Sequence, residues 1–333
     1  MKRRCPNPHC HLEPSLLPGG ISEDPRFKTI VRKGYFYRTR DRRRITRYRC
    51  QRCGKHFSSS THSPDYRQKK RDLNPSILKL FASGVSQRRM AKILDVNPKT
   101  IVRKFHLLAN RAHQEHLMRI ERLRPQSISS IQFDDLETFE HTKCKPLSVS
   151  LAVNKETREL LAFEVSRIPA RGHLAKISRR KYGHRKDERP IAWTRLFETL
   201  QPIVKTGAIV ESDENPHYPR FVMKHMPGMV HLRHPGARGA ITGQGELKKL
   251  RFDPLFSLNH SFAMLRANIN RLFRKTWCTT KKPEGLIAHI WIYLRYHNTV
   301  LIRAQSRLPA QSTGAVNFAP CRTDTSGSSA GNS

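Results

Sequence analysis

Acidic residues are scarce in this chain. Its 333 residues include 26 Asp and Glu residues against 63 Lys and Arg residues, which gives a formal net charge of +37 at pH 7. A charge of this sign and size attracts polyanions and speeds association with them. The composition therefore predicts nucleic acid as the main partner, and an anionic membrane surface is the alternative.

Long apolar runs are absent as well. The sequence contains no stretch of about 18 apolar residues, the length at which a transmembrane helix becomes a candidate. Its first residues, Met-Lys-Arg-Arg-Cys-Pro, lack the apolar segment of a signal peptide. We therefore expect a cytoplasmic protein with no membrane partner.

Cysteine is sparse, but four of the seven cysteines form two short-spaced pairs near the N-terminus. The pairs are Cys5 with Cys10 and Cys50 with Cys53. Two such pairs, about 40 residues apart, can close one tetrahedral thiolate site for zinc. Because the first pair is wider than usual, His9 or His11 could replace one of its thiolates. Four unrelated free thiols are the alternative interpretation.

The first 60 residues are predicted to form a zinc-ribbon-like domain. They contain short β-like runs but few large apolar residues, so core burial alone cannot fold them and metal binding would supply the missing free energy. The second pair lies in Cys-Gln-Arg-Cys-Gly-Lys-His-Phe, which resembles a zinc knuckle. We therefore expect the zinc to be structural. The run Arg38–Arg49 is strongly basic and could contact phosphates.

Residues 74–121 have the periodicity of a helix-turn-helix domain. We expect three short helices, in which Gly84 ends the first, Ser86 caps the second and Asn97 caps the third. The third helix is then predicted to present four polar side chains outward: Lys99, Thr100, Arg103 and Lys104. Such a helix fits the major groove of double-stranded DNA. An ordinary three-helix bundle with a solvated charged face is the alternative.

An α/β pattern follows over residues 129–302. The predicted strands are Ser129–Phe133, Leu147–Val153, Leu160–Val165, Gly207–Glu211 and Met229–Leu232. Helices are predicted after Pro190, over Leu258–Trp277 and over Leu286–Tyr296, and Lys176–Arg189 is predicted to be a loop or insertion. Residues 304–333 are rich in Ser, Gly, Thr and Ala, and we expect them to be disordered.

Two aspartates follow two of these predicted strands. Asp134 comes after Ile131-Gln-Phe, and Asp213 comes after Ile209-Val-Glu-Ser. If the two strands are neighbours, the carboxylates could hold two divalent ions about 3.5–4 Å apart. Magnesium or manganese would suit this site, because both prefer hard oxygen ligands. Ordinary turn aspartates at strand ends are the alternative.

The order of these parts is similar to that of a known family. A zinc ribbon, a helix-turn-helix and two strand-terminal aspartates resemble the insertion-sequence-one family of bacterial transposases, within the DDE superfamily. The matching motifs are Asp134-Asp135, Ser212-Asp213 with Tyr218 downstream, and the Arg-Lys-Thr-containing helix that includes Arg266. The resemblance spans about residues 1–300.

This resemblance implies a ribonuclease H-like catalytic domain, in which the first and fourth strands are neighbours. It implies a DNA transposase of the bacterial nucleoid that binds terminal inverted repeats, assembles as a homo-oligomer on DNA, and cuts and joins strands. The basic residues of the last motif would bind DNA phosphates near the metal ions: Arg266, Arg271, Arg274 and Lys275.

One position departs from the family. A catalytic glutamate is expected seven residues before Arg266, and this chain has Asn259 there, followed by His260. Asparagine offers a carbonyl oxygen without charge, and His260 could bind a metal or transfer a proton. Asp253 and Glu246 lie upstream as other candidates. A catalytically impaired DNA-binding regulator is therefore an alternative function, and an RNA-binding zinc protein is a third.

Overall fold

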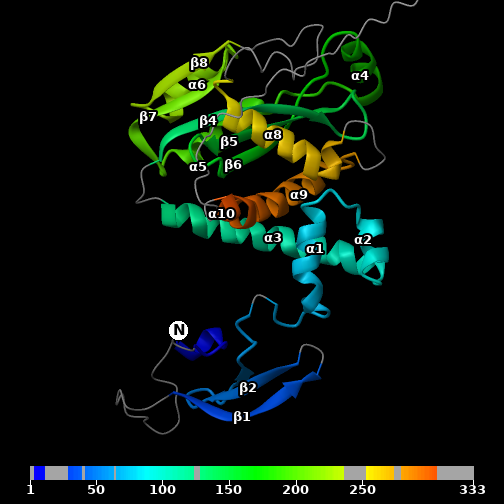
Figure 1. Cartoon of the computed structure of the whole chain (residues 1–333), viewed down its shortest axis with the longest axis vertical. Coiled ribbons are helices and arrows are strands. Elements are labelled where there is room, and N and C mark those ends of the chain that lie inside the picture. Colours follow the sequence, from blue (N-terminus) through cyan, green and yellow to red (C-terminus); the bar gives the residue numbers. More distant parts are fainter. Residues whose placement is uncertain are drawn as a thin grey trace, which may run out of the picture.

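Two β-sheets and a set of helices make up the protein, so its class is α/β (Figure 1). The structure is a computed structural model that describes residues 4–11, 29–39, 42–63, 65–123, 128–235, 253–273 and 279–305. Glu246, Arg274, Lys275 and the tail after residue 305 lie outside these ranges, so the predictions made for them remain predictions. Among the described residues, no helix is both long and apolar enough to cross a membrane.

The N-terminal part is a small antiparallel sheet. Its three strands, in the order β1-β2-β3, are β1 (Ile30–Arg38), β2 (Arg43–Cys50) and β3 (His56–Ser58). A short 3-10 helix, η1 (Pro8–His11), precedes them in the chain. Among the described residues, the buried apolar cluster of this part consists of Cys5, Tyr48, Cys50 and Phe57. This core is too small to account for folding by apolar burial alone.

A helical module follows. It contains the 3-10 turn η4 (Arg71–Leu73) and the helices α1 (Asn74–Phe81), α2 (Gln87–Ile93) and α3 (Pro98–Leu123). The predicted caps are confirmed: Ser86 Oγ accepts a hydrogen bond from the Arg89 amide, and Asn97 Oδ1 accepts one from the Lys99 amide at 2.9 Å. The turn between α1 and α2 contains Gly84 with a φ of +69°.

The prediction of a short third helix is wrong. Helix α3 has 26 residues, because apolar residues continue at helical spacing as far as Ile120 and are buried. Helix α3 packs against α9 (Pro283–Tyr296), and Ile292 of α9 belongs to the core of the helical module. His289 of α9 is also hydrogen-bonded through Nε2 to the Phe81 carbonyl at 3.0 Å. The helical module is therefore joined to the C-terminal helix through a continuous apolar core.

The larger sheet has five strands in the order β6-β5-β4-β7-β8. They are β4 (Ile128–Phe139), β5 (Pro146–Asn154), β6 (Leu160–Arg167), β7 (Val204–Asp213) and β8 (Val230–His234). Strand β5 is antiparallel to both of its neighbours, β4 and β6, whereas β4, β7 and β8 run parallel. All five predicted strands are present in this mixed sheet.

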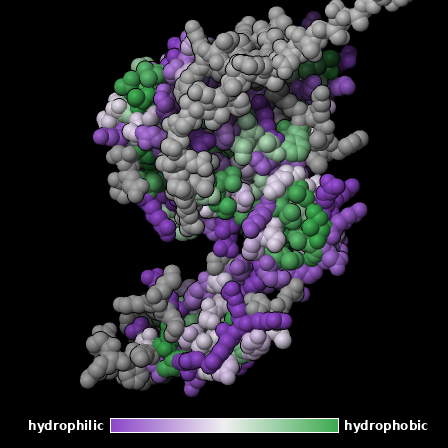
Figure 2. All heavy atoms as spheres, in the orientation of Figure 1, coloured by the Kyte–Doolittle hydropathy of each residue, from purple (hydrophilic) through white to green (hydrophobic). Residues whose placement is uncertain are grey.

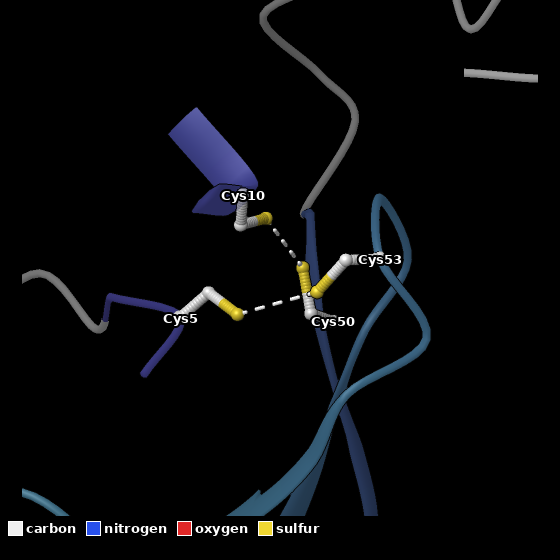
Figure 3. A group of neighbouring side chains, drawn as sticks. All are labelled: Cys5, Cys10, Cys50 and Cys53. Atoms are coloured by element: carbon white, nitrogen blue, oxygen red, sulfur yellow. Dashed lines mark hydrogen bonds between the residues drawn. The ribbon is translucent and has the colours of Figure 1, made fainter. Parts of the chain in front are cut away.

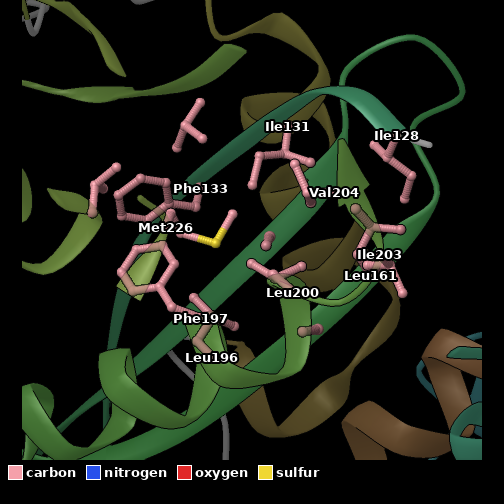
Figure 4. Packing of buried hydrophobic residues seen from close by; sticks show 14 of the residues in the cluster. Ile128, Ile131, Phe133, Leu161, Leu196, Phe197, Leu200, Ile203, Val204 and Met226 are labelled. Carbon is pink, nitrogen blue, oxygen red and sulfur yellow. The ribbon is translucent and has the colours of Figure 1, made fainter. Parts of the chain in front are cut away.

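Helices cover both faces of this sheet. One face carries α5 (Arg189–Leu200) and α6 (Tyr218–His225), and Figure 4 shows the apolar core between these helices and the strands. The other face carries α8 (Phe256–Asn268) and α9. Because both faces are covered, β5 is buried along nearly its whole length. The chain then continues as a π-helical turn, η6 (His297–Leu301), and α10 (Ile302–Gln305).

Two helix predictions need correction. Part of the segment predicted as a loop is helix α4 (Leu174–Tyr182), which ends at Gly183. Helix α8 ends at Asn268 and does not continue to residue 277, because the backbone of Ile269 is extended and a separate 3-10 turn, η5 (Asn270–Leu272), follows.

Candidate active site and metal centre

Four cysteines meet at the base of the N-terminal sheet (Figure 3). The Cys5 and Cys53 sulfurs lie 3.5 Å apart, and the Cys10 and Cys50 sulfurs lie 3.6 Å apart. All four sulfurs lie within 4.8 Å of one another. A tetrahedral zinc ion with bonds of about 2.3 Å separates its sulfurs by about 3.8 Å, so this cluster can bind a metal such as zinc.

The backbone around the second cysteine pair is built for a metal site. Gly54 has a φ of +68° and closes a tight turn, and the Cys50 amide donates to the Lys55 carbonyl at 2.9 Å. Burial acts to raise the pKa of the Cys53 thiol, but hydrogen bonds, chiefly from the Lys55 backbone, outweigh it and lower the pKa to about 6. His9 is exposed and does not belong to the cluster, and the side chain of His11 is outside the described residues.

Asp134 and Asp213 lie side by side on neighbouring parallel strands. Gln132 of β4 pairs with Glu211 of β7, and each aspartate follows two residues later on its own strand. Residues two apart share a face of a sheet, so both aspartates project on the side covered by α8. One prediction is wrong, since Asp134 does not end its strand. Strand β4 continues to Phe139 because its second half pairs with β5.

Each of the two carboxylates is fixed through one oxygen. Asp134 Oδ1 accepts hydrogen bonds from the Tyr218 hydroxyl at 3.0 Å and from the Asp135 amide at 2.6 Å. Asp213 Oδ1 accepts from the Asn215 amide at 3.0 Å. Among the described residues, no donor contacts the Oδ2 atom of either aspartate. The geometry therefore orients both groups and leaves one oxygen of each for another ligand.

The electrostatics of the pair are unfavourable without a cation. Burial raises the pKa of the Asp134 carboxyl to about 7, and the negative charge of Asp213 adds to the rise. Two adjacent carboxylates that resist joint ionisation are a common feature of functional sites. Asp135 does not belong to the pair, because its carboxylate turns to the other face and accepts from Trp193 Nε1 at 3.1 Å.

A buried polar network holds α8 over the sheet next to this pair. Glu211 is 3 % exposed and binds Lys155 Nζ at 2.7 Å and Gln132 Nε2 at 2.7 Å. The Gln132 amide group also donates to the Pro254 carbonyl and accepts from the Leu258 amide. The sequence pattern did not identify this network. Polar residues within the otherwise buried cores of β4 and β7 were the available signal.

Asn259 and His260 do not complete the aspartate pair in this structure. Asn259 is exposed, and its amide donates to Asp253 Oδ2 at 2.9 Å. The His260 ring lies against Phe256, with 5.8 Å between the ring centroids. Burial lowers the pKa of His297, and the nearby His260 adds to this effect. Within the described part of the chain, the four cysteines are the only group of three or more potential ligands close enough to share a metal ion.

The predicted DNA-contacting face of α3 is partly as expected. Lys99 and Arg103 are exposed and Thr100 is half-buried, all near the first turns of the helix. The prediction for Lys104 is wrong, since it is 6 % exposed and points inward. Its Nζ donates to Asn74 Oδ1 at 2.7 Å and to a glutamine side chain, so it neutralises no external charge.

The two described basic residues predicted to lie near the metal ions, Arg266 and Arg271, differ in their surroundings. Arg266 is exposed on the last turn of α8. The Arg271 guanidinium lies over the Phe105 ring at 5.5 Å and against Gly285, at the junction of η5, α3 and α9. Arg271 therefore contributes to the contact between the helical module and the sheet domain.

Comparison with known families finds no family model that matches this chain, and comparison with curated proteins finds no relative. A functional assignment must therefore be argued from the geometry and charge of the described residues.

Proposed function

We propose that this protein is a DNA transposase whose catalytic metal ions are held by Asp134 and Asp213. The observation that carries the proposal is the placement of these two carboxylates on neighbouring parallel strands, each fixed through one oxygen. When bound, magnesium or manganese ions would activate a water or 3′-hydroxyl and stabilise the charge on the reacting phosphate. The protein's own contribution is to orient the two carboxylates before an ion arrives.

The sheet supports a ribonuclease H-like catalytic domain. Its first strand in the chain, β4, lies beside its fourth, β7, which is the neighbour relation that this fold requires. The two aspartates come from these two strands. The alternative that both are ordinary turn aspartates fits the structure less well. Asp134 lies within β4, and its carboxylate accepts a hydrogen bond from the buried Tyr218.

The N-terminal modules support DNA as the substrate. Helix α3 begins with an Asn97 cap and carries Lys99 and Arg103 exposed in its first turns, as expected for a helix that enters the major groove of double-stranded DNA. Zinc bound by the four cysteines would stabilise the basic sheet of β1, β2 and β3, which precedes the helical module. We propose that these parts recognise the inverted ends of a mobile DNA element.

A cleavage and strand-transfer assay tests the proposal. The substrates are duplexes carrying the DNA ends that flank this reading frame, with manganese present. We expect the wild type to cut and join them, and Asp213→Asn to abolish both steps while keeping duplex binding. Glu198→Gln is the matched control, because Glu198 is an exposed acid on α5 away from the pair.

A DNA-binding regulator without catalysis is the second candidate. The observation that favours it is Asn259, which stands where the resemblance expects a carboxylate and is hydrogen-bonded to Asp253. Fewer carboxylates weaken the binding of hard divalent ions. Specific duplex binding by the wild type with no cleavage under any divalent metal would establish this second function and overturn the first.

A further inference from the structure

The β1–β2 ribbon exposes aromatic rings to solvent. Tyr35 and Tyr37 are 56 % and 58 % exposed, although tyrosine usually covers part of its ring in a folded protein. They lie two residues apart on β1 and therefore on the same face of the ribbon. Arg44, from β2, pairs directly with Tyr37 across the strands and places its guanidinium 3.6 Å from the Tyr35 ring centroid.

The charged side chains described on β1 and β2 are all cationic. The exposed cations of the two strands are Arg32, Lys33, Arg43, Arg44, Arg47 and Arg49. Arg44 lies over Tyr35, whereas Arg47 lies over Phe36, on the opposite face of the ribbon. No acidic residue occurs in the described parts of residues 29–63. Figure 2 shows hydrophilic side chains gathered over this sheet, at the bottom of the view. The surface is therefore suited to a polyanion. In addition to charge, it offers flat aromatic rings.

Exposed rings between cations favour unpaired bases over a duplex. In a duplex the base faces are covered by their neighbours in the stack, so a protein ring can reach a base face only where the base has left that stack. The two tyrosines are spaced about 6.8 Å apart along the strand, twice the separation of stacked bases in a duplex strand. A regular stack cannot place adjacent bases on both rings, whereas an extended single strand can.

We propose that the Tyr35–Tyr37 face of the ribbon binds single-stranded DNA, with bases stacked on the two rings and phosphates neutralised by the surrounding arginines. This mode combines aromatic stacking with a cationic surface and tolerates different sequences. It adds a single-strand site to the duplex contacts of α3. It rests on nucleic acid as the partner of this chain, but not on catalysis by the aspartate pair.

Fluorescence anisotropy with the zinc-loaded full-length protein tests the site. The probe is a labelled oligothymidine of roughly ten nucleotides, within the usual range for such surfaces. Replacing Tyr37 with alanine should weaken binding of this probe roughly tenfold, and replacing both tyrosines should weaken it further. Tyr37→Phe keeps the ring and should bind as the wild type does. Duplex binding should change little in all three variants.

Tyr66→Ala is the matched control, because Tyr66 is also exposed and also lies beneath an arginine, Arg67, but outside the ribbon. An unchanged zinc content and melting temperature would show that the ribbon variants fold. Photocrosslinking of 5-iodouracil oligonucleotides gives an independent readout, with the crosslink expected at Tyr35 or Tyr37.

Three results would overturn the proposal. They are wild-type binding of oligothymidine by Tyr37→Ala, equal losses for duplex and single strand, and tighter binding of the matching RNA strand by the same face. Each is independent of strand transfer, so the loss of the ribbon site would leave the proposed transposase function intact. Conversely, an inactive aspartate pair would leave the ribbon site intact.

Discussion

The Tyr218 hydroxyl donates a hydrogen bond to Asp134 Oδ1 across 3.0 Å, and this bond joins the start of α6 to the middle of β4. Tyr218 is completely buried, with its ring packed among Phe133 and Trp193. The ring is thus part of the apolar core, while its single polar atom serves the carboxylate pair. One residue therefore links the stability of the sheet to the orientation of the site.

Tyr218→Phe should separate these two roles. The variant keeps the ring in the core but removes a hydrogen bond to an ionised group, which is typically worth about 1.5–3 kcal/mol. We expect manganese affinity to fall at least tenfold, and the melting temperature to fall by several degrees while the protein still folds. Isothermal titration calorimetry measures the first and thermal unfolding the second. Unchanged manganese affinity would show that Asp134 is oriented without the hydroxyl.

The pKa of Asp134 predicts a pH-dependent cost in stability. This pKa is about 7 in the folded protein and 3.8 for an unperturbed aspartate, so the folded state binds a proton more tightly than the unfolded state. Stability from this group is fully present below pH 3.8 and is lost as the pH rises from there through about 7. The loss is on the order of 4 kcal/mol at full ionisation, since each pKa unit corresponds to about 1.4 kcal/mol.

Asp134→Asn should therefore stabilise the metal-free protein above neutral pH and have a much smaller effect at about pH 4. Denaturant unfolding at the two pH values measures the difference. Manganese should raise the melting temperature of the wild type, because it relieves the repulsion with Asp213, and should not do so for Asp134→Asn. Lower stability of the variant at high pH would contradict this account.

Much of the sheet could be predicted from the sequence, because apolar runs mark buried strands. The second half of β4 could not, since Asp134, Asp135 and Glu137 interrupt its apolar pattern. That half is a strand because β5 supplies a complete antiparallel partner as far as Phe139 and Pro146. In such segments, pairing with a strand distant in the sequence determines the secondary structure, and a local sequence pattern does not predict that pairing.

The two aspartates could be chosen from the sequence, but their adjacency depends on strand order. The network around Glu211 depends on still more distant partners, since Gln132 lies 79 residues before it and binds α8 residues over 120 residues later. Buried polar groups need partners wherever the fold brings them. The sequence reveals a polar residue within a buried strand, but it does not reveal which distant groups form its hydrogen bonds.

Removal of the metal should unfold the N-terminal sheet selectively. The apolar cluster in the described part of this sheet is small, so we expect metal binding by the four cysteines to supply much of its stability. A zinc chelator, or Cys53→Ser, should expose residues 29–63 to proteolysis while the larger sheet remains protected. Cys144→Ser is the control, because Cys144 is buried outside the cluster. Equal protection with and without chelator would contradict a structural metal.

Neighbouring cations on α3 should have opposite phenotypes. Lys104 lies on the same stripe as Ile101 and Phe105, and its buried Nζ is bonded to Asn74, so Lys104→Ala leaves that amide without its donor. We expect a loss of about 1–3 kcal/mol in unfolding free energy, measured by denaturant titration. Arg103→Ala removes an exposed side chain and should leave stability unchanged but weaken duplex binding and reduce its salt dependence. If Arg103→Ala instead bound duplex DNA as the wild type does across salt concentrations, the exposed face of α3 would not be the duplex-contacting surface.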